Sequence, residues 1–272
     1  LRLMATPGDV FGQAAQYLQI YFAGVAGLML YNLGSGILRA VGDSRRPLYF
    51  LLFSAGLNTV LDLLFVAVFR WGVAGAAIAT VVAQAISALL MLVVLTRAQG
   101  CYRICWHGMR FQRGILRNIF LVGVPSALQL AITSFSNVFV QSYVNRFSSS
   151  CMAGWATYAK LDAFAFVPMT TLSVAATTFV GQNVGAGNWE RAKRGTRCAL
   201  LMATVVTVVI LIPLMLWAQP LCALFNREPE VLQYGVYFVR LISPFYLLCN
   251  FNQIYAGSLR GAGDAKMPMV IM

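Results

Sequence analysis

The residues best suited to chemistry in this sequence are a few polar side chains that interrupt long apolar runs. Asp62 is the clearest of them, because it stands in an apolar run that continues to Phe69. A carboxylate in a membrane span costs on the order of 3 kcal/mol, so it needs a partner, a proton or a function. Ser54 and Asn58 precede Asp62 at intervals of four residues, which places the three side chains on one face of a helix.

A second polar stripe lies in the next apolar run, across a predicted helical hairpin at Arg70–Trp71. At ~1.5 Å per residue, Asp62 and Thr80 should both lie roughly 11 to 12 Å below the outer ends of their helices. The same spacing places Asn58 level with Gln84. We predict a coupling-ion site here, in which the carboxylate carries a proton or binds Na⁺ and the other side chains donate oxygen ligands. The predicted site consists of Asp62, Asn58, Thr80 and Gln84. Interhelical hydrogen bonding that only holds a bundle together is the alternative.

Another set of polar residues interrupts the apolar runs of the second half and offers candidates for a substrate cavity. They are Gln129, Thr133, Asn137, Gln141, Lys160, Asp162 and Arg240. The first four recur every four residues, which marks a helix face turned away from lipid, where they either line a cavity or join helices. Lys160 and Asp162 do not share a helix face, so we predict that Asp162 pairs with Arg240 across helices.

The elements that must position these residues are membrane-spanning helices. Of the 272 residues 60% are hydrophobic and 10% are charged, and the mean hydropathy is +0.74, which is far too apolar for a water-soluble domain. Runs of ~20 apolar residues without alternating polarity predict helices rather than barrel strands, and hence an all-α, polytopic membrane helix bundle. The predicted spans are 13–37, 47–69, 72–95, 119–145, 152–180, 197–219 and 230–257.

The net charge of +12 is a topology signal rather than a sign of nucleic-acid binding. Fourteen of the twenty basic residues fall in alternate loops on one side of the predicted spans, and four fall on the other side. The positive-inside rule makes the basic loops cytoplasmic, in a multi-pass protein of the cell membrane. The fourteen residues are Arg39, Arg45, Arg46, Arg97, Arg103, Arg110, Arg113, Arg117, Arg191, Lys193, Arg194, Arg197, Arg260 and Lys266.

The sequence offers no constellation typical of an enzyme or a metal site. Cys101, Cys105 and His107 form a C-x3-C-x-H string, but a fourth ligand is not nearby, so we expect neither a metal nor a cofactor beyond a coupling ion, H⁺ or Na⁺. His107 is the single histidine, and a nucleophile with a matching base is lacking. An integral membrane enzyme therefore remains the weaker alternative to a transporter.

The chain contains an internal repeat, in which residues 36–47 match residues 257–268 at an offset of 221. Both copies end on the basic side, so the repeat is parallel, and the offset implies about six helices in each half. We expect a twelve-helix protein of two pseudo-symmetric halves, truncated here at both ends. In that organisation residues 1–110 hold the last three helices of the N-terminal bundle with an inner linker, and residues 111–272 hold most of the C-terminal bundle.

Four motifs, in order and at matching spacing, resemble those of the multidrug and toxic compound extrusion family. They are the repeated L-R-x-x-G-D-x-[RK]-x-P turn, the pair Asn58-x3-Asp62, the run 72–80 and the string 180–187. The similarity covers nearly the whole chain, from about the fourth helix of that family to the start of the eleventh.

The resemblance implies a monomeric antiporter in the lipid bilayer that exports small organic, cationic or amphipathic compounds in exchange for H⁺ or Na⁺. Some members use an acid and an asparagine on the fifth helix and a threonine on the sixth as a cation site, and these positions match Asp62, Asn58 and Thr80. A lipid-linked saccharide flippase of related fold is the alternative, since it would favour a more cationic cavity and Lys160 and Arg240 fit that preference.

Overall fold

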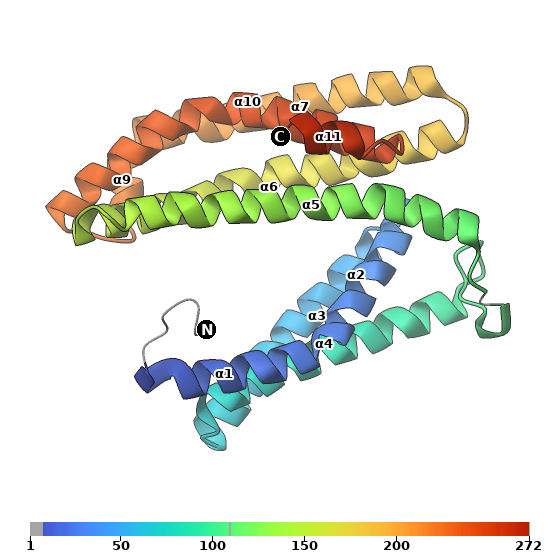
Figure 1. Ribbon diagram of the computed structural model, residues 1–272, viewed down its shortest axis with the longest axis horizontal. Coiled ribbons are helices and arrows are strands. Elements are labelled where there is room, and N and C mark those ends of the chain that lie inside the picture. Colours follow the sequence, from blue (N-terminus) through green and yellow to red (C-terminus); the bar gives the residue numbers. More distant parts are fainter. Residues whose placement is uncertain (1–7, 109, 272) are drawn as a thin grey trace. The chain divides into compact units, whose positions relative to one another are not determined.

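A computed structural model describes residues 8–108 and 110–271, and within these ranges the chain is helical and contains no strand (Figure 1). The all-α prediction is therefore confirmed. The chain divides into two compact units, residues 1–110 and residues 111–272.

The first unit is organised around α4, which packs against each of the other three long helices. Small side chains make these contacts close, and Ala77 and Ala79 are fully buried. Leu38 packs against Met91 and Leu95 of α4 to form an apolar core. The elements are α1 (Gly8–Ala23), α2 (Val25–Ala40), α3 (Arg45–Asp62), a π-helical segment η2 (Leu63–Val68), α4 (Gly72–Arg97) and the short η3 (Trp106–Gly108).

The second unit is organised around α6, which packs against α7, α9 and α10. The hydroxyls of Ser173 and Thr177 donate to the carbonyl oxygens of Gln253 and Gly257 at 2.7 and 2.8 Å. Gly257 and Gly261 stand four residues apart, and small residues at this spacing let two membrane helices approach closely. The elements are α5 (Arg113–Val144), α6 (Ser149–Gly185), α7 (Trp189–Leu216), α8 (Ala218–Ala223), α9 (Pro229–Ile242), η4 (Ser243–Phe245), α10 (Tyr246–Gly261) and α11 (Lys266–Ile271).

Six helical stretches of the described residues are long and apolar enough to cross a membrane, and the α1–α2 pair raises the number to seven. The predicted span 13–37 differs from a straight helix, because the chain bends by 45° between α1 and α2. Gly24 lies at this bend against the side chain of Val81 on α4, where an added Cβ would collide. The bend is therefore located where a glycine allows the helices to touch.

The internal repeat is visible in the element boundaries. The offset of 221 residues carries α2, Val25–Ala40, onto α10, Tyr246–Gly261, and carries the first residue of α3 onto the first residue of α11. The bend at Gly24 likewise corresponds to the end of the η4 segment, which interrupts the span Pro229–Gly261. A broken helix and the start of the helix after it are thus present in both units.

The repeated turn has the same hydrogen bonds in both copies. Gly42 and Gly263 adopt φ of 89° and 91°, in the left-handed region that glycine tolerates best. The next residue, Asp43 or Asp264, caps the following helix: Asp43 Oδ1 accepts from the backbone N–H groups of Arg45 and Arg46 at 3.1 and 3.2 Å. Asp264 Oδ1 accepts from the corresponding two N–H groups at 3.0 and 3.2 Å. The motif is explained by helix termination and capping.

Replacing Gly42 with alanine should lower the free energy of unfolding by about 1–2 kcal/mol, the cost of a left-handed backbone for an L-residue. An added Cβ meets no atom within 4 Å, so backbone strain is the only expected cause. Gly36→Ala is the matched control, because Gly36 lies inside α2 with equally open space around it and should gain about 0.5–1 kcal/mol. Thermal unfolding in detergent measures both changes, and equal shifts would contradict the argument.

Candidate functional site

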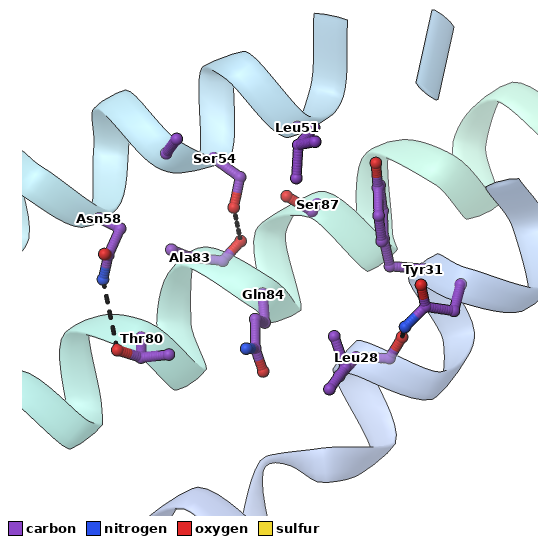
Figure 2. A pocket seen from close by; sticks show the side chains of 11 residues that line it. Leu28, Tyr31, Leu51, Ser54, Asn58, Thr80, Ala83, Gln84 and Ser87 are labelled. Carbon is purple, nitrogen blue, oxygen red and sulfur yellow. Dashed lines mark hydrogen bonds between the residues drawn. The ribbon is translucent and has the colours of Figure 1, made fainter. Parts of the chain in front are cut away.

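A cavity of about 290 Å³ lies between α2, α3 and α4 of the first unit, and Figure 2 shows its polar side chains converging from these helices. Three of the four residues predicted for the coupling-ion site line it: Asn58, Thr80 and Gln84. The remaining lining residues are Leu28, Tyr31, Asn32, Leu51, Ser54, Ala55, Ala83 and Ser87.

The register between α3 and α4 differs from the prediction by one helical turn. Asn58 Nδ2 donates to Thr80 Oγ1 at 3.5 Å, so Asn58, rather than Asp62, lies opposite Thr80. Ser54 Oγ donates to the Ala83 carbonyl oxygen at 3.1 Å. Ser54 therefore lies at the height of Gln84 along the helices, the position that was predicted for Asn58. The predicted spacing assumed an α-helix up to Phe69, whereas the π-helical segment puts more residues into each turn and shortens the outer part of the helix.

Asp62 is not among the lining residues and lies at the junction between α3 and the π-helical segment. Its Oδ1 is shielded from solvent and has no hydrogen-bond partner among the described residues. The turn that follows is covered by stacked aromatic rings, with the centroids of Phe65 and Trp71 5.1 Å apart. A buried carboxylate oxygen without a donor is costly, and π-helical turns are frequent at functional sites, so Asp62 remains the main candidate for binding a proton or cation.

Three of the hydroxyl protons around the cavity, those of Ser54, Thr80 and Tyr31, are directed at backbone carbonyl oxygens. Thr80 Oγ1 donates to the Ala76 carbonyl oxygen at 3.0 Å, in addition to the Ser54 bond described above. Tyr31 donates its phenolic proton to the Pro47 carbonyl oxygen at 2.9 Å. Each of these oxygens therefore keeps lone pairs but has no free proton to offer, which suits a hard cation better than an anion.

Two further polar side chains add acceptor capacity. The Asn32 amide nitrogen donates to the Leu28 carbonyl oxygen at 2.9 Å, which leaves its Oδ1 as an acceptor. Ser87 Oγ is buried and has no partner among the described residues. The cavity can thus supply neutral oxygen ligands, with a carboxylate one turn away on α3.

A different polar cluster occupies the second unit around Asp162. Its Oδ1 accepts hydrogen bonds from the hydroxyls of Tyr158, at 2.9 Å, and Tyr246, at 2.6 Å. The predicted pairing of Asp162 with Arg240 is wrong, because no ion pair joins these two residues in the described part of the chain and Arg240 is exposed. Tyrosine hydroxyls satisfy the carboxylate without bringing a second charge into the apolar core, which avoids the desolvation of a cation.

Three polar side chains buried in the second unit have no hydrogen-bond partner among the described residues. Asn250 on α10 is fully buried with both its amide nitrogen and its oxygen unpaired. Ser243, in the η4 break, and Thr207, on α7, are each 1% exposed and also unpaired. Unpaired polar groups are costly in an apolar interior. These three side chains therefore indicate that this part of the bundle does more than pack helices together.

Comparison with known proteins places the chain in a family. The sequence model called MatE matches residues 1–64 and 125–272. The chain belongs to the MatE family. It is 33% identical over its whole length to the "Probable multidrug resistance protein YpnP" of Bacillus subtilis, and 27% identical over 97% of its length to the "Probable multidrug resistance protein NorM" of Thermotoga maritima. It spans 60% and 58% of the lengths of these two relatives.

Solved structures of MatE proteins share the fold. A crystal structure of a MATE transporter in the bent conformation superimposes with a TM-score of 0.92 at 25% identity, covering 99% of this chain and 60% of that one. A multidrug resistance MATE family transporter in an outward-facing conformation matches equally well, with a TM-score of 0.92 and 61% of its chain covered. The apolar helices and this family membership make the protein an integral membrane protein.

The other predicted cavity residues of this MatE chain do not form one site. Gln129 on α5 is buried and accepts a hydrogen bond from Arg260 Nη1 at 3.3 Å, which is a contact between helices. Thr133 donates to the Gln129 carbonyl oxygen at 2.9 Å. Asn137 and Gln141 are exposed. Lys160 is exposed as well, with its ammonium 5.2 Å from the centre of the Phe225 ring.

Reasoning from sequence missed several residues that the MatE fold brings together. Tyr31, Asn32 and Ser87 line the cavity of the first unit, but their positions on α2 and α4 give no signal until the packing of these helices is known. Tyr158 precedes Asp162 by four residues, and that spacing alone predicts a contact on one helix face. Tyr246 is the partner from a distant segment and had no such signal.

Replacing Tyr246 with phenylalanine removes one donor to Asp162 and leaves the ring in place. The free energy of unfolding should fall by about 1–2 kcal/mol, because a carboxylate in a membrane protein interior loses a hydrogen bond. Tyr237→Phe is the control, since the Tyr237 ring is 61% exposed and its hydroxyl has no hydrogen bond in the described residues. Unfolding in detergent measures both variants, and equal effects would show that the Asp162 contact contributes little.

Proposed function

We propose that the complete protein is a secondary active antiporter that exports small organic compounds, cationic or amphipathic in character, in exchange for H⁺ or Na⁺. Membership of the MatE family supports transport rather than an enzymatic reaction, and two matched relatives carry multidrug resistance names. The chain covers about 60% of those relatives, so the activity belongs to the longer protein of which these helices form part.

The observation that carries the coupling part of the proposal is the oxygen-lined cavity of the first unit. A cavity within a bundle of apolar helices, in which three hydroxyls direct their protons at backbone carbonyls, favours a cation over an anion. Asn58 and Thr80, which are hydrogen-bonded to each other, supply neutral oxygens in its lining. Asp62, one turn further along α3, supplies the negative charge or the proton-binding carboxylate.

A division of labour between the polar residues follows. Asp62 changes its protonation or pairs with Na⁺, while Asn58, Thr80 and Gln84 replace part of the hydration shell of the ion. An ion bound here contacts α2, α3 and α4 together, so its arrival and departure bias the packing of these helices. The proposed orientation in the cell membrane keeps the basic loops, including the Gly42 turn, on the cytoplasmic side.

Export by the complete protein is tested in proteoliposomes loaded with a cationic dye under an imposed proton or sodium gradient. We expect gradient-dependent, saturable dye movement that stops when the gradient is dissipated. A parallel arm with flavin adenine dinucleotide tests an anionic cargo, because a relative from Shewanella oneidensis, 27% identical, carries the name "FAD transporter". Movement of the flavin but not the dye would contradict a cationic substrate, and dye release at the same rate without an ion gradient would contradict antiport.

Thr80→Ala should raise the coupling-ion concentration for half-maximal transport by about tenfold, equivalent to about 1.4 kcal/mol. We expect this effect because the substitution removes Thr80 Oγ1, one of the oxygens that line the cavity. Thr59→Ala is a close control, because the exposed Thr59 makes the same bond to a carbonyl four residues earlier, Thr59 Oγ1 to Ala55 O at 3.0 Å, but points away from the cavity. Should Thr80→Ala match Thr59→Ala, the cavity does not bind the ion.

A further inference from the structure

A groove of about 450 Å³ lies at one end of the second unit, between the last turns of α6 and α10 and the first turns of α7. No residue of the predicted ion or substrate sites lines it. Its walls are Val180 and Val184 of α6, Trp189, Ala192, Lys193, Thr196 and Arg197 of α7, Tyr255, Ser258 and Leu259 of α10, and Ala262 directly after α10.

The charged wall of the groove is a stripe on α7. Trp189, Lys193 and Arg197 recur every four residues, so they stand above one another on one face of the helix. Arg197 has no ion pair or hydrogen bond in the described part of the chain, and Lys193 is held only by an exposed bond of 3.1 Å to Glu190. The first turns of α7 carry four basic residues against the single acid Glu190. Since Glu190 pairs with Lys193 and Arg197 has no partner among the described residues, the stripe keeps a net positive charge.

The rest of the groove is suited to hydrocarbon. The valines of α6, Leu259 of α10, and the alanines Ala192 and Ala262 form its apolar floor. Trp189 and Tyr255, 56% and 48% exposed, stand at its rim, and these two residue types are enriched where a membrane helix meets the headgroup layer. The hydroxyls of Thr196 and Ser258 are hydrogen-bonded to each other at 3.1 Å. They therefore have less capacity left to bind water in the groove.

We propose that this groove binds one anionic diacyl phospholipid, with the phosphate at Lys193 and Arg197 and an acyl chain along the apolar floor. Basic pockets between membrane helices are suited to acidic headgroups, and each Lys or Arg near the surface contributes measurably to such binding. A soluble anion would use the charged stripe but leave the valine-lined floor empty. An organic cation would meet two positive charges. The combination of charge and apolar floor matches a lipid, and it does not depend on the proposed antiport.

Native mass spectrometry of the complete protein tests the site with phosphatidylglycerol and phosphatidylcholine of identical acyl chains. The double variant K193Q/R197Q should lose retained phosphatidylglycerol by about 25-fold, about fivefold for each charge removed. R191Q/R194Q is the matched control, because it removes two positive charges from the same turns of α7 but at positions outside the groove. Its retention should stay within about twofold of the wild type.

Equal losses in the two double variants would show that bulk surface charge is responsible and would overturn the proposal. Equal retention of the two lipids by the wild type would overturn it as well. A second measurement does not depend on the folding of the charge variants. It follows the fluorescence of Trp189, obtained as the difference between the wild type and W189F. The quencher is phosphatidylglycerol brominated on its acyl chains. We expect stronger quenching than with brominated phosphatidylcholine, and equal quenching by the two lipids contradicts the site.

Discussion

The structure depends on the need to pair every backbone polar group inside the hydrocarbon of a bilayer. Continuous helices meet this need by themselves, so the informative places are those where a helix breaks. At the α1–α2 bend the Gly24 N–H still reaches the carbonyl oxygens of Ile20 and Tyr21, both at 3.1 Å. At the α9–α10 break the segment contains Pro244, which has no N–H to leave unpaired. At both breaks the residue at the interruption thus either keeps its amide paired, as Gly24 does, or has no amide, as at Pro244.

Each broken helix is supported by the straight helix at the centre of its unit. In the first unit α4 contacts both α1 and α2, and in the second α6 contacts both α9 and α10. The polar residues gather beside the second segment of each broken helix: Tyr31 and Asn32 on α2, and Tyr246 and Asn250 on α10.

The sequence was sufficient for the helices and for the repeat, because both depend on local patterns. Apolar runs gave the spans, and the glycine and aspartate of the repeated turn gave its geometry, since φ > 0 and helix capping are local properties. The register of α3 against α4 was predicted one turn off, because the π-helical segment after Asp62 has no clear sequence signature. The partner of Asp162 was also predicted wrongly, since charge favoured Arg240 while packing brings Tyr246. Contacts between distant helices were thus the part that patterns did not specify.

The two polar clusters differ in where their protons point, and this difference separates their chemical capacities. Around the cavity of the first unit, the hydroxyls of Ser54, Thr80 and Tyr31 direct their protons at backbone carbonyls, so their oxygens keep lone pairs. Around Asp162 the tyrosine protons are directed at the carboxylate itself, so its charge is already solvated by the protein. The first arrangement gains most from an added cation, whereas in the second two hydrogen bonds already stabilise one oxygen of the carboxylate. Of these two carboxylates, Asp62, with a buried oxygen that has no partner among the described residues, is therefore the one from which a bound ion would displace fewer hydrogen bonds.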